Sequence, residues 1–180
     1  LFTRGSMYLT HNSNLLYHGC IPMDKEGNFE KFEIEGKTHS GKLLCDHFDR
    51  VARKGYFQRK SKGEENTSLD YMWYLWCGPL SPLFGKMKMA TFERYYIADK
   101  ETHTESRNPY YNLAFKEEKY CNKILEEFDL DPEISHIVNG HVPVKVKKGE
   151  SPIKANGKLF VIDGGMSIPY QSVTGVSGYT

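Results

Sequence analysis

Short β-favouring runs stand at both ends of this 180-residue chain, and helical patterns occupy the middle between them. Near the N-terminus, apolar runs at residues 7–10 and 15–19 flank turn-forming residues at 12–14, which predicts two short strands joined by a tight turn. Toward the C-terminus, strand-favouring residues return in three segments: 134–138, 142–146 and 158–162. Strands so far apart in the chain can share one sheet only if the middle is an insertion between them.

This organisation predicts an α/β (α+β) protein. We expect residues 1–36 and 131–180 to form part of one sheet-containing core, and residues 37–130 to form a mostly helical, aromatic, cap-like insertion. Residues 29–37 show no convincing period, and we expect them to be irregular.

Three helices are predicted within the insertion. Apolar residues recur at helical spacing between Ser40, which can cap the start, and Gly55, which can end the helix. A second helix is expected over residues 68–76. A third one has Asn108 as its N-cap and ends before Asp131.

Bulk properties exclude several classes of protein. A formal net charge of +1 provides no field that would attract a polyanion, so we expect no nucleic-acid partner. No apolar stretch approaches the roughly 18 residues needed to span a bilayer, so we expect no membrane partner. The four cysteines are widely spaced, which indicates reduced thiols in a cytoplasmic protein. The chain starts without Met and ends without a closing helix, so we expect it to be a piece of a longer polypeptide.

Two histidines stand beside glycine at the ends of predicted strands: His18 precedes Gly19, and His141 follows Gly140. A strand end is a rigid place from which to project an imidazole, and an adjacent glycine lets the backbone turn so that a metal or a phosphate can approach. We therefore regard His18 and His141 as candidate metal ligands. The alternative is that each is an ordinary polar side chain beside a strand.

Longer runs around these histidines resemble a known family. The HGCIP run from His18 and the GHVP run from Gly140 resemble the fourth and fifth blocks of calcineurin-like metallophosphoesterases. Three runs are more closely similar to Firmicutes-type (class III) fructose-1,6-bisphosphatases: NLLYHGCIP at 14–22, YLWCGPLSPLFGK at 74–86, and the segment from KGESP at 148 to VIDGG at 165. The similarity covers nearly the whole chain.

The resemblance implies the C-terminal half of a metallophosphoesterase β-sandwich flanked by helices, with His18 and His141 as ligands of a binuclear Mn²⁺ site. Such a site takes its other ligands from Asp-x-His, Gly-Asp…Asp-Arg and Gly-Asn-His blocks, and none of these occurs here. We interpret the nearest phrase, residues 46–50, as one helix face. Because carboxylates supply the negative charge that holds two dications together, we expect no catalytic residue in this chain and no activity from it alone.

A sugar bisphosphate substrate would need cationic groups for its second phosphate. The candidates are Arg94, Lys86, Lys145 and Lys154, and for each of them we favour a structural role. Asp163 could orient a ligating imidazole or cap the turn that follows it, and we favour the turn.

Aromatic residues of the same segments are assigned to packing. Tyr17 should point to the opposite strand face from His18 and belong to the core. Trp73 and Trp76 are interpreted as packing residues of the middle segment rather than as a sugar platform.

The leading hypothesis is a metal-dependent phosphoric monoester hydrolase of gluconeogenesis, which removes the 1-phosphate of fructose 1,6-bisphosphate. Two alternatives stay open: a phosphoprotein (Ser/Thr) phosphatase-like hydrolase, and a non-catalytic binding module. The sequence also leaves a homo-oligomer open.

Overall fold

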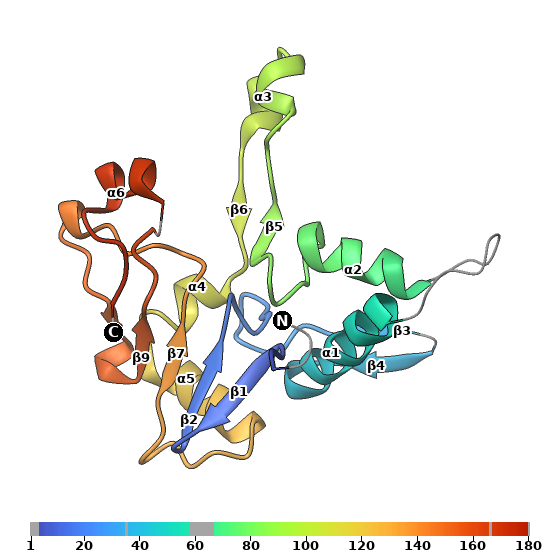
Figure 1. The fold of residues 1–180 in the computed structure, drawn as a ribbon, viewed down its shortest axis with the longest axis vertical. Coiled ribbons are helices and arrows are strands. Elements are labelled where there is room, and N and C mark those ends of the chain that lie inside the picture. The colour runs from blue at the N-terminus through green and yellow to red at the C-terminus, as the bar shows by residue number, and fades with distance from the viewer. Residues whose placement is uncertain (1–3, 35, 58–66, 166, 180) are drawn as a thin grey trace.

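The computed structural model describes residues 4–34, 36–57, 67–165 and 167–179 (Figure 1). Its centre is a mixed five-stranded sheet with the strand order β1-β2-β7-β9-β8. The strands are β1 (Tyr8–His11), β2 (Asn14–Tyr17), β7 (Ile137–Asn139), β9 (Leu159–Val161) and β8 (Ile153–Lys154). β2, β7 and β9 run parallel to one another, while β1 and β8 are antiparallel edge strands. The α/β prediction is confirmed, and the metallophosphoesterase sandwich stays a prediction.

The three parallel strands pair in a register that aligns their buried residues. Leu15, Ile137 and Leu159 are partners in one row across the sheet, and Tyr17, Asn139 and Val161 are partners in the next. All six side chains are buried. Since side chains alternate between the faces of a strand, these two rows place the core on one face of the sheet.

Helices from the middle of the chain cover this core. α4 (Tyr110–Leu113) and α5 (Glu118–Glu127) lie behind the sheet in Figure 1, and α1 (Gly41–Phe57) packs against α2 (Thr67–Cys77) beside it. Buried residues of the sheet and of these helices form one cluster, which includes Leu15, Ile137, Phe48, Tyr110 and Ile124. The division into a core and an insertion stays a prediction.

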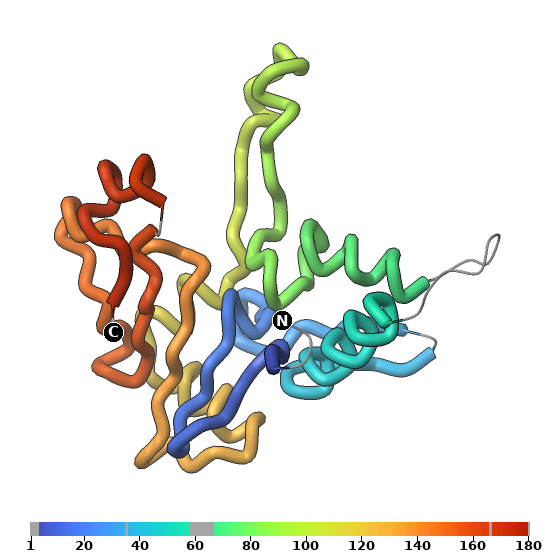
Figure 2. The backbone as a smooth tube through the Cα atoms, in the orientation of Figure 1, coloured from blue at the N-terminus to red at the C-terminus, as the bar shows by residue number. Residues whose placement is uncertain are grey.

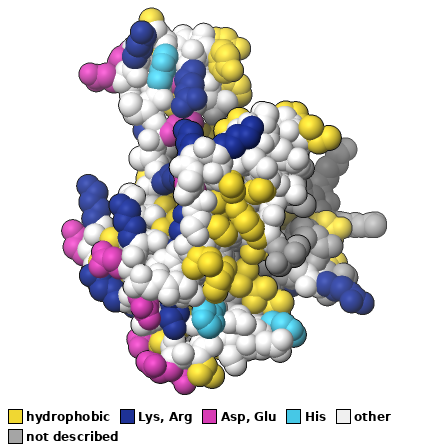
Figure 3. All heavy atoms as spheres, turned by 90° about the vertical axis from the view of Figure 1, so that its left-hand side faces the viewer, with side chains coloured by type: hydrophobic (Ala, Val, Ile, Leu, Met, Phe, Trp, Pro, Cys, Tyr) yellow, Lys and Arg dark blue, Asp and Glu magenta, His cyan; other side chains and the backbone are white. Residues whose placement is uncertain are grey.

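A two-stranded arm projects from the body (Figures 1 and 2). It consists of β5 (Lys86–Lys88), α3 (Glu93–Tyr96), the 3₁₀ turn η1 (Lys100–His103) and β6 (Ser106–Arg107). On the face drawn in Figure 3, charged side chains of both signs lie on the arm, and hydrophobic side chains gather on the body beneath it.

The remaining elements are short. β3 (Phe32–Ile34) pairs with β4 (Lys37–His39) before α1. The C-terminal part contains η2 (Val146–Lys148), η3 (Ala155–Gly157) and α6 (Ile168–Thr174). Along the described ranges, no helix combines the length and the apolar character that crossing a lipid bilayer requires. The four cysteines are free, as expected.

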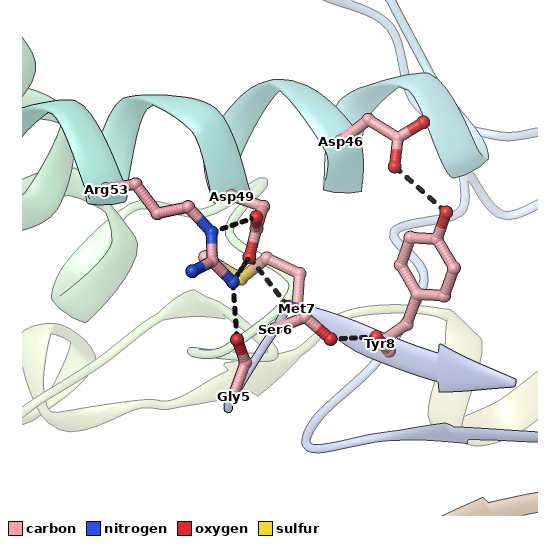
Figure 4. Close-up of polar contacts among 7 residues, drawn as sticks. All are labelled: Gly5, Ser6, Met7, Tyr8, Asp46, Asp49 and Arg53. Atoms are coloured by element: carbon pink, nitrogen blue, oxygen red, sulfur yellow. Dashed lines mark hydrogen bonds and ion pairs between the residues drawn. The ribbon is translucent and has the colours of Figure 1, made fainter. Parts of the chain in front are cut away.

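The first residues of the described chain are fastened to α1 by polar contacts (Figure 4). The Met7 N–H donates to Asp49, and the Arg53 guanidinium donates both to Asp49 and to the Gly5 carbonyl. The Tyr8 hydroxyl donates to Asp46 at 2.9 Å. Asp46 and Asp49 therefore lie on the face of α1 that meets the N-terminal segment, and they hold β1 against the helix.

Several predictions about local structure are wrong. The expectation that residues 29–37 are irregular is wrong for 32–34 and 37, because β3 pairs there with β4. Residues 142–146 do not form a strand: Pro143 has no N–H to donate, and the Val144 N–H bonds the Asp163 carbonyl outside any ladder.

The predicted third helix is divided in two. α4 ends at Leu113, and Glu117 is extended, with φ −122° and ψ 121°. The Phe115 carbonyl between them accepts the Ala155 N–H at 3.2 Å, so this backbone is bonded to another segment instead of continuing the helix.

Two expectations about single residues also fail. Gly55 does not end α1 but lies inside it, where an added Cβ would be 2.8 Å from the Met72 sulfur and 3.0 Å from the Ser68 carbonyl; its small size permits close packing of α1 on α2. Trp73 and Trp76 do not pack, because α2 buries only Ser68 and Leu75 and leaves the indoles 71% and 77% exposed.

The start of α1 is capped from a distance, which generates a stability prediction. The Lys42 N–H donates to Glu127 of α5 at 3.0 Å. Since a carboxylate satisfies an otherwise unpaired donor at a helix N-terminus, Glu127→Ala should lower the free energy of unfolding by about 1 kcal/mol. Urea denaturation measures the change, with the exposed neighbour Glu126→Ala as the matched control. Equal stability of the two variants would contradict the capping role.

Candidate functional site

Three candidate residues meet at one edge of the sheet. Parallel strands have their carboxyl ends at the same edge, and His18 follows β2 directly, while His141 and Asp163 each lie two residues after β7 and β9. Backbone hydrogen bonds hold these ends together: the Gly140 N–H donates to the His18 carbonyl, and the Ile162 N–H donates to the Asn139 carbonyl. The carboxyl ends of parallel strands are where open sheets of this type commonly bind ligands.

The two imidazoles face each other across this edge. His18 Nε2 lies 3.0 Å from His141 Nδ1, and the rings meet edge to face with centroids 4.9 Å apart. His141 Nε2 lies 2.9 Å from the Phe84 carbonyl oxygen. Because a carbonyl only accepts, Nε2 of the neutral His141 carries the proton and Nδ1 presents its lone pair, which His18 Nε2–H meets. A backbone partner of this kind is typical of histidines that bind metals.

The backbone at His141 is in the left-handed region, with φ +65°. The Val142 N–H donates to the Gly140 carbonyl at 2.7 Å, so His141 is the central residue of a three-residue turn. This conformation is uncommon for a residue with a side chain, and such strain is concentrated at functional sites. The sequence led us to expect that the adjacent glycine, Gly140, would let the backbone turn. The residue that turns the chain is His141 instead.

Gly19 has a different reason to be glycine. An added Cβ there would be 2.4 Å from the Pro82 carbonyl oxygen, which accepts the Cys20 N–H at 2.9 Å. The absence of a side chain thus lets the 82–84 segment cross closely behind His18. The same segment supplies the Phe84 carbonyl that orients His141.

Both imidazoles favour their neutral form. Desolvation by the surrounding residues lowers the pKa of His18 from its ordinary value of 6.5, although part of the ring stays exposed. Burial also lowers the pKa of His141, and the neighbouring His18 and Lys86 lower it further. The Asp163 carboxylate opposes both shifts. Neutral rings are the form that metal ligation requires.

A buried polar network behind the imidazoles was missed by the sequence analysis. The Asn139 amide donates to the Gly19 carbonyl and to the Tyr110 hydroxyl, each at 3.1 Å, and the Tyr110 hydroxyl lies 2.6 Å from that of Tyr17. All three side chains are buried, as predicted for Tyr17. The network joins the residue before His18, the residue after it, and the strand that leads to His141. Its sequence signal was a lone polar residue, Asn139, at the end of an apolar run.

Asp163 and Lys86 lie near the imidazole pair. Asp163 Oδ1 accepts the Gly165 N–H at 2.8 Å, so this side chain caps the turn after β9, which is the role that the sequence favoured. Lys86 pairs with Glu105 at 2.9 Å and acts electrostatically on His141.

Of the other three cationic candidates, Arg94 and Lys154 lie away from the pair, and Lys145 shows only a backbone contact among the described residues. Arg94 lies on the arm and pairs with the same Glu105 at 3.2 Å. Lys154 is the partner of Leu159 at the opposite end of β9, where its ammonium lies 5.7 Å from the centroid of the Phe115 ring. The Lys145 N–H donates to Glu150 at 3.1 Å. Their assignment to phosphate binding stays a prediction.

The pair fits part of a metal site. Two neutral imidazoles converge, and a backbone carbonyl orients one of them, as in known first coordination shells. However, within the part of the chain that the structure describes, no group of three or more His, Cys, Asp and Glu side chains could hold a metal ion. His18 and His141 could therefore contribute two ligands, and further ligands would have to come from elsewhere.

Comparisons with known proteins identify the family to which this chain belongs. The family model described as Firmicute fructose-1,6-bisphosphatase matches residues 1–180, so the chain belongs to this family. Proteins named fructose-1,6-bisphosphatase class 3 are similar over all 180 residues: 56% identical in Clostridium novyi (strain NT), 57% in Clostridium botulinum (strain Alaska E43 / Type E3) and 56% in Fusobacterium nucleatum subsp. nucleatum. The chain spans only 27%, 27% and 28% of their lengths, respectively. No solved structure matches.

The electrostatics of the pair can be tested by titration. In NMR spectra of the chain, both imidazoles should titrate below pH 6.5. Lys86→Met should raise the pKa of His141 and leave the pKa of His18 unchanged, because the ammonium lowers the pKa of His141 alone. Asp163→Asn should lower the pKa values of both histidines, since the carboxylate stabilises the protonated imidazoles. An unchanged His141 pKa in the Lys86→Met variant would show that the Lys86 ammonium does not lie near His141.

The buried network generates a second prediction. Asn139→Leu removes two hydrogen bonds and leaves the Gly19 carbonyl unpaired, so it should lower the free energy of unfolding by about 1–3 kcal/mol and shift both imidazole resonances. Tyr17→Phe is the control, because it keeps both Asn139 bonds and should cost no more than about 1 kcal/mol. Unchanged imidazole resonances in Asn139→Leu would show that the network does not position the pair.

Proposed function

We propose that the chain forms part of a metal-dependent phosphoric monoester hydrolase that removes the 1-phosphate of fructose 1,6-bisphosphate. The observation that carries the proposal is the convergence of His18 and His141, 123 positions apart, in a chain that belongs to the Firmicute fructose-1,6-bisphosphatase family. The relatives' printed names support the substrate, and the paired imidazoles support a metal site.

The proposed metal centre is a binuclear Mn²⁺ site of the metallophosphoesterase type. Two such cations would lower the pKa of a bridging water and neutralise the phosphate oxygens. In this chain, His141 would bind through Nδ1, and His18 would bind through Nε2 once its proton is on Nδ1. The Phe84 carbonyl would fix the His141 ring, and the Asn139 network would hold both strand ends. The carboxylate ligands would come from the rest of the polypeptide. We also propose a role in gluconeogenesis and a cytoplasmic location.

Lys86 is the cation best placed to meet substrate. Its ammonium is near enough to lower the pKa of His141, and its partner Glu105 is only partly exposed. Of the four cationic candidates, it alone shifts the pKa of an imidazole of the pair, so we propose it ahead of Arg94, Lys145 and Lys154.

The test uses a hybrid protein, in which this chain replaces the matched 180 residues of the Clostridium novyi relative. The hybrid should release phosphate from fructose 1,6-bisphosphate in the presence of Mn²⁺. His141→Ala should lower both metal content and turnover by more than about 100-fold, because even residues that only orient ligands are worth 10–100-fold.

A matched control and a competing substrate sharpen this test. His136→Ala should keep full activity, because His136 precedes β7 at the opposite edge of the sheet. His141→Ala with normal metal content and rate would refute the ligand assignment. Phosphate release from a phosphopeptide, with none from the sugar bisphosphate, would favour the phosphoprotein phosphatase alternative.

A further inference from the structure

A large apolar groove opens beside the imidazole pair. Its volume is about 840 Å³, and His18 and His141 form part of its wall. Apolar side chains line most of the rest, among them Met7, Met72, Leu75, Trp76, Leu83 and Met89. These side chains come from the N-terminal segment, α2, the loop before the arm, and the base of the arm. We call this feature the apolar groove.

The chemistry of the lining does not suit a sugar bisphosphate. Phosphates require cationic or N–H donors. Arg53 is the one Lys or Arg among the described lining residues, and its guanidinium already bonds Asp49 and the Gly5 carbonyl (Figure 4). The apolar lining suits an apolar partner, either a small ligand or a protein segment. The length of the relatives favours a protein segment as the occupant.

The length of the relatives indicates where such a segment comes from. The chain spans 27% of the Clostridium novyi relative, so about three quarters of that polypeptide lies outside the matched residues. The described residues contain no group of three metal-binding side chains, so the proposed metal site needs ligands from another part of the polypeptide. That part must reach His18 and His141, which form a wall of the groove.

We propose that the apolar groove is the surface on which the remainder of the family's polypeptide packs, covering Trp76 and bringing further ligands to the imidazole pair. The supply of further metal ligands rests on the proposed function, whereas the packing on the groove does not depend on it. Burial of the groove would explain why α2 carries an outward tryptophan, 77% exposed, directly beside the site.

Cys77 provides a direct probe. Its thiol is exposed and lines the groove, whereas the other three cysteines are buried. Alkylation by N-ethylmaleimide, followed by mass spectrometry of the Cys77 peptide, should be at least about tenfold slower in the hybrid than in the 180-residue chain. The matched control is the thiol of Trp73→Cys in a Cys77→Ser background, because Trp73 lies on α2 but does not line the groove. It should react at the same rate in both proteins.

A second measurement uses the two tryptophans as a pair. Trp76→Glu should leave the stability of the 180-residue chain unchanged, because the indole is exposed there, and should lower the melting temperature of the hybrid. Trp73→Glu should change neither. Equal Cys77 reactivity in both proteins, or identical effects of the two tryptophan variants, would overturn the proposal.

Two further outcomes separate the hypotheses. Concentration-dependent dimerisation of the 180-residue chain, measured by sedimentation and accompanied by Cys77 protection, would assign the groove to a second copy and overturn the proposal. A hybrid that protects Cys77 but releases no phosphate would support the packing and refute the proposed function.

Discussion

Two parallel pairings, β2 with β7 and β7 with β9, bring His18, His141 and Asp163 to one edge of the sheet. No local interaction could do this, because 123 positions separate the histidines. The register matters as much as the pairing: a slip by one residue would turn Asn139 and Tyr17 out of the core and would separate the imidazoles. The buried row of Tyr17, Asn139 and Val161 thus fixes the register at the point where the site begins.

The sequence was informative wherever local pattern and burial agreed. The β1–β2 turn, α1, α2 and β9 follow from their own residues, and the two histidines were identified by their place at strand ends. The long helix over 108–130 was predicted as one element because its apolar spacing continues through the break. That break depends on the Ala155 N–H, which binds the Phe115 carbonyl from another part of the chain, and no helical pattern records such a contact.

The site shows the same limit. His18 and His141 were predicted as residues, but their 3.0 Å approach depends on strand pairing that the sequence does not state. The Phe84 carbonyl that orients His141 has no sequence signal, because every residue carries a carbonyl. The two tryptophans were assigned to packing on hydrophobicity alone. Their exposure depends on which other surfaces surround α2, and this cannot be derived from the segment itself.

The left-handed backbone at His141 restricts which substitutions this position can accept. β-Branched and bulky apolar side chains are strongly disfavoured at φ +65°, whereas His, Asn, Asp and Gly are tolerated. Of these four, three carry a nitrogen or oxygen that can bind a cation. Most substitutions that this turn accepts therefore keep a side chain that can bind a cation. The backbone conformation thus limits the loss of a ligand at this position, even without selection for activity.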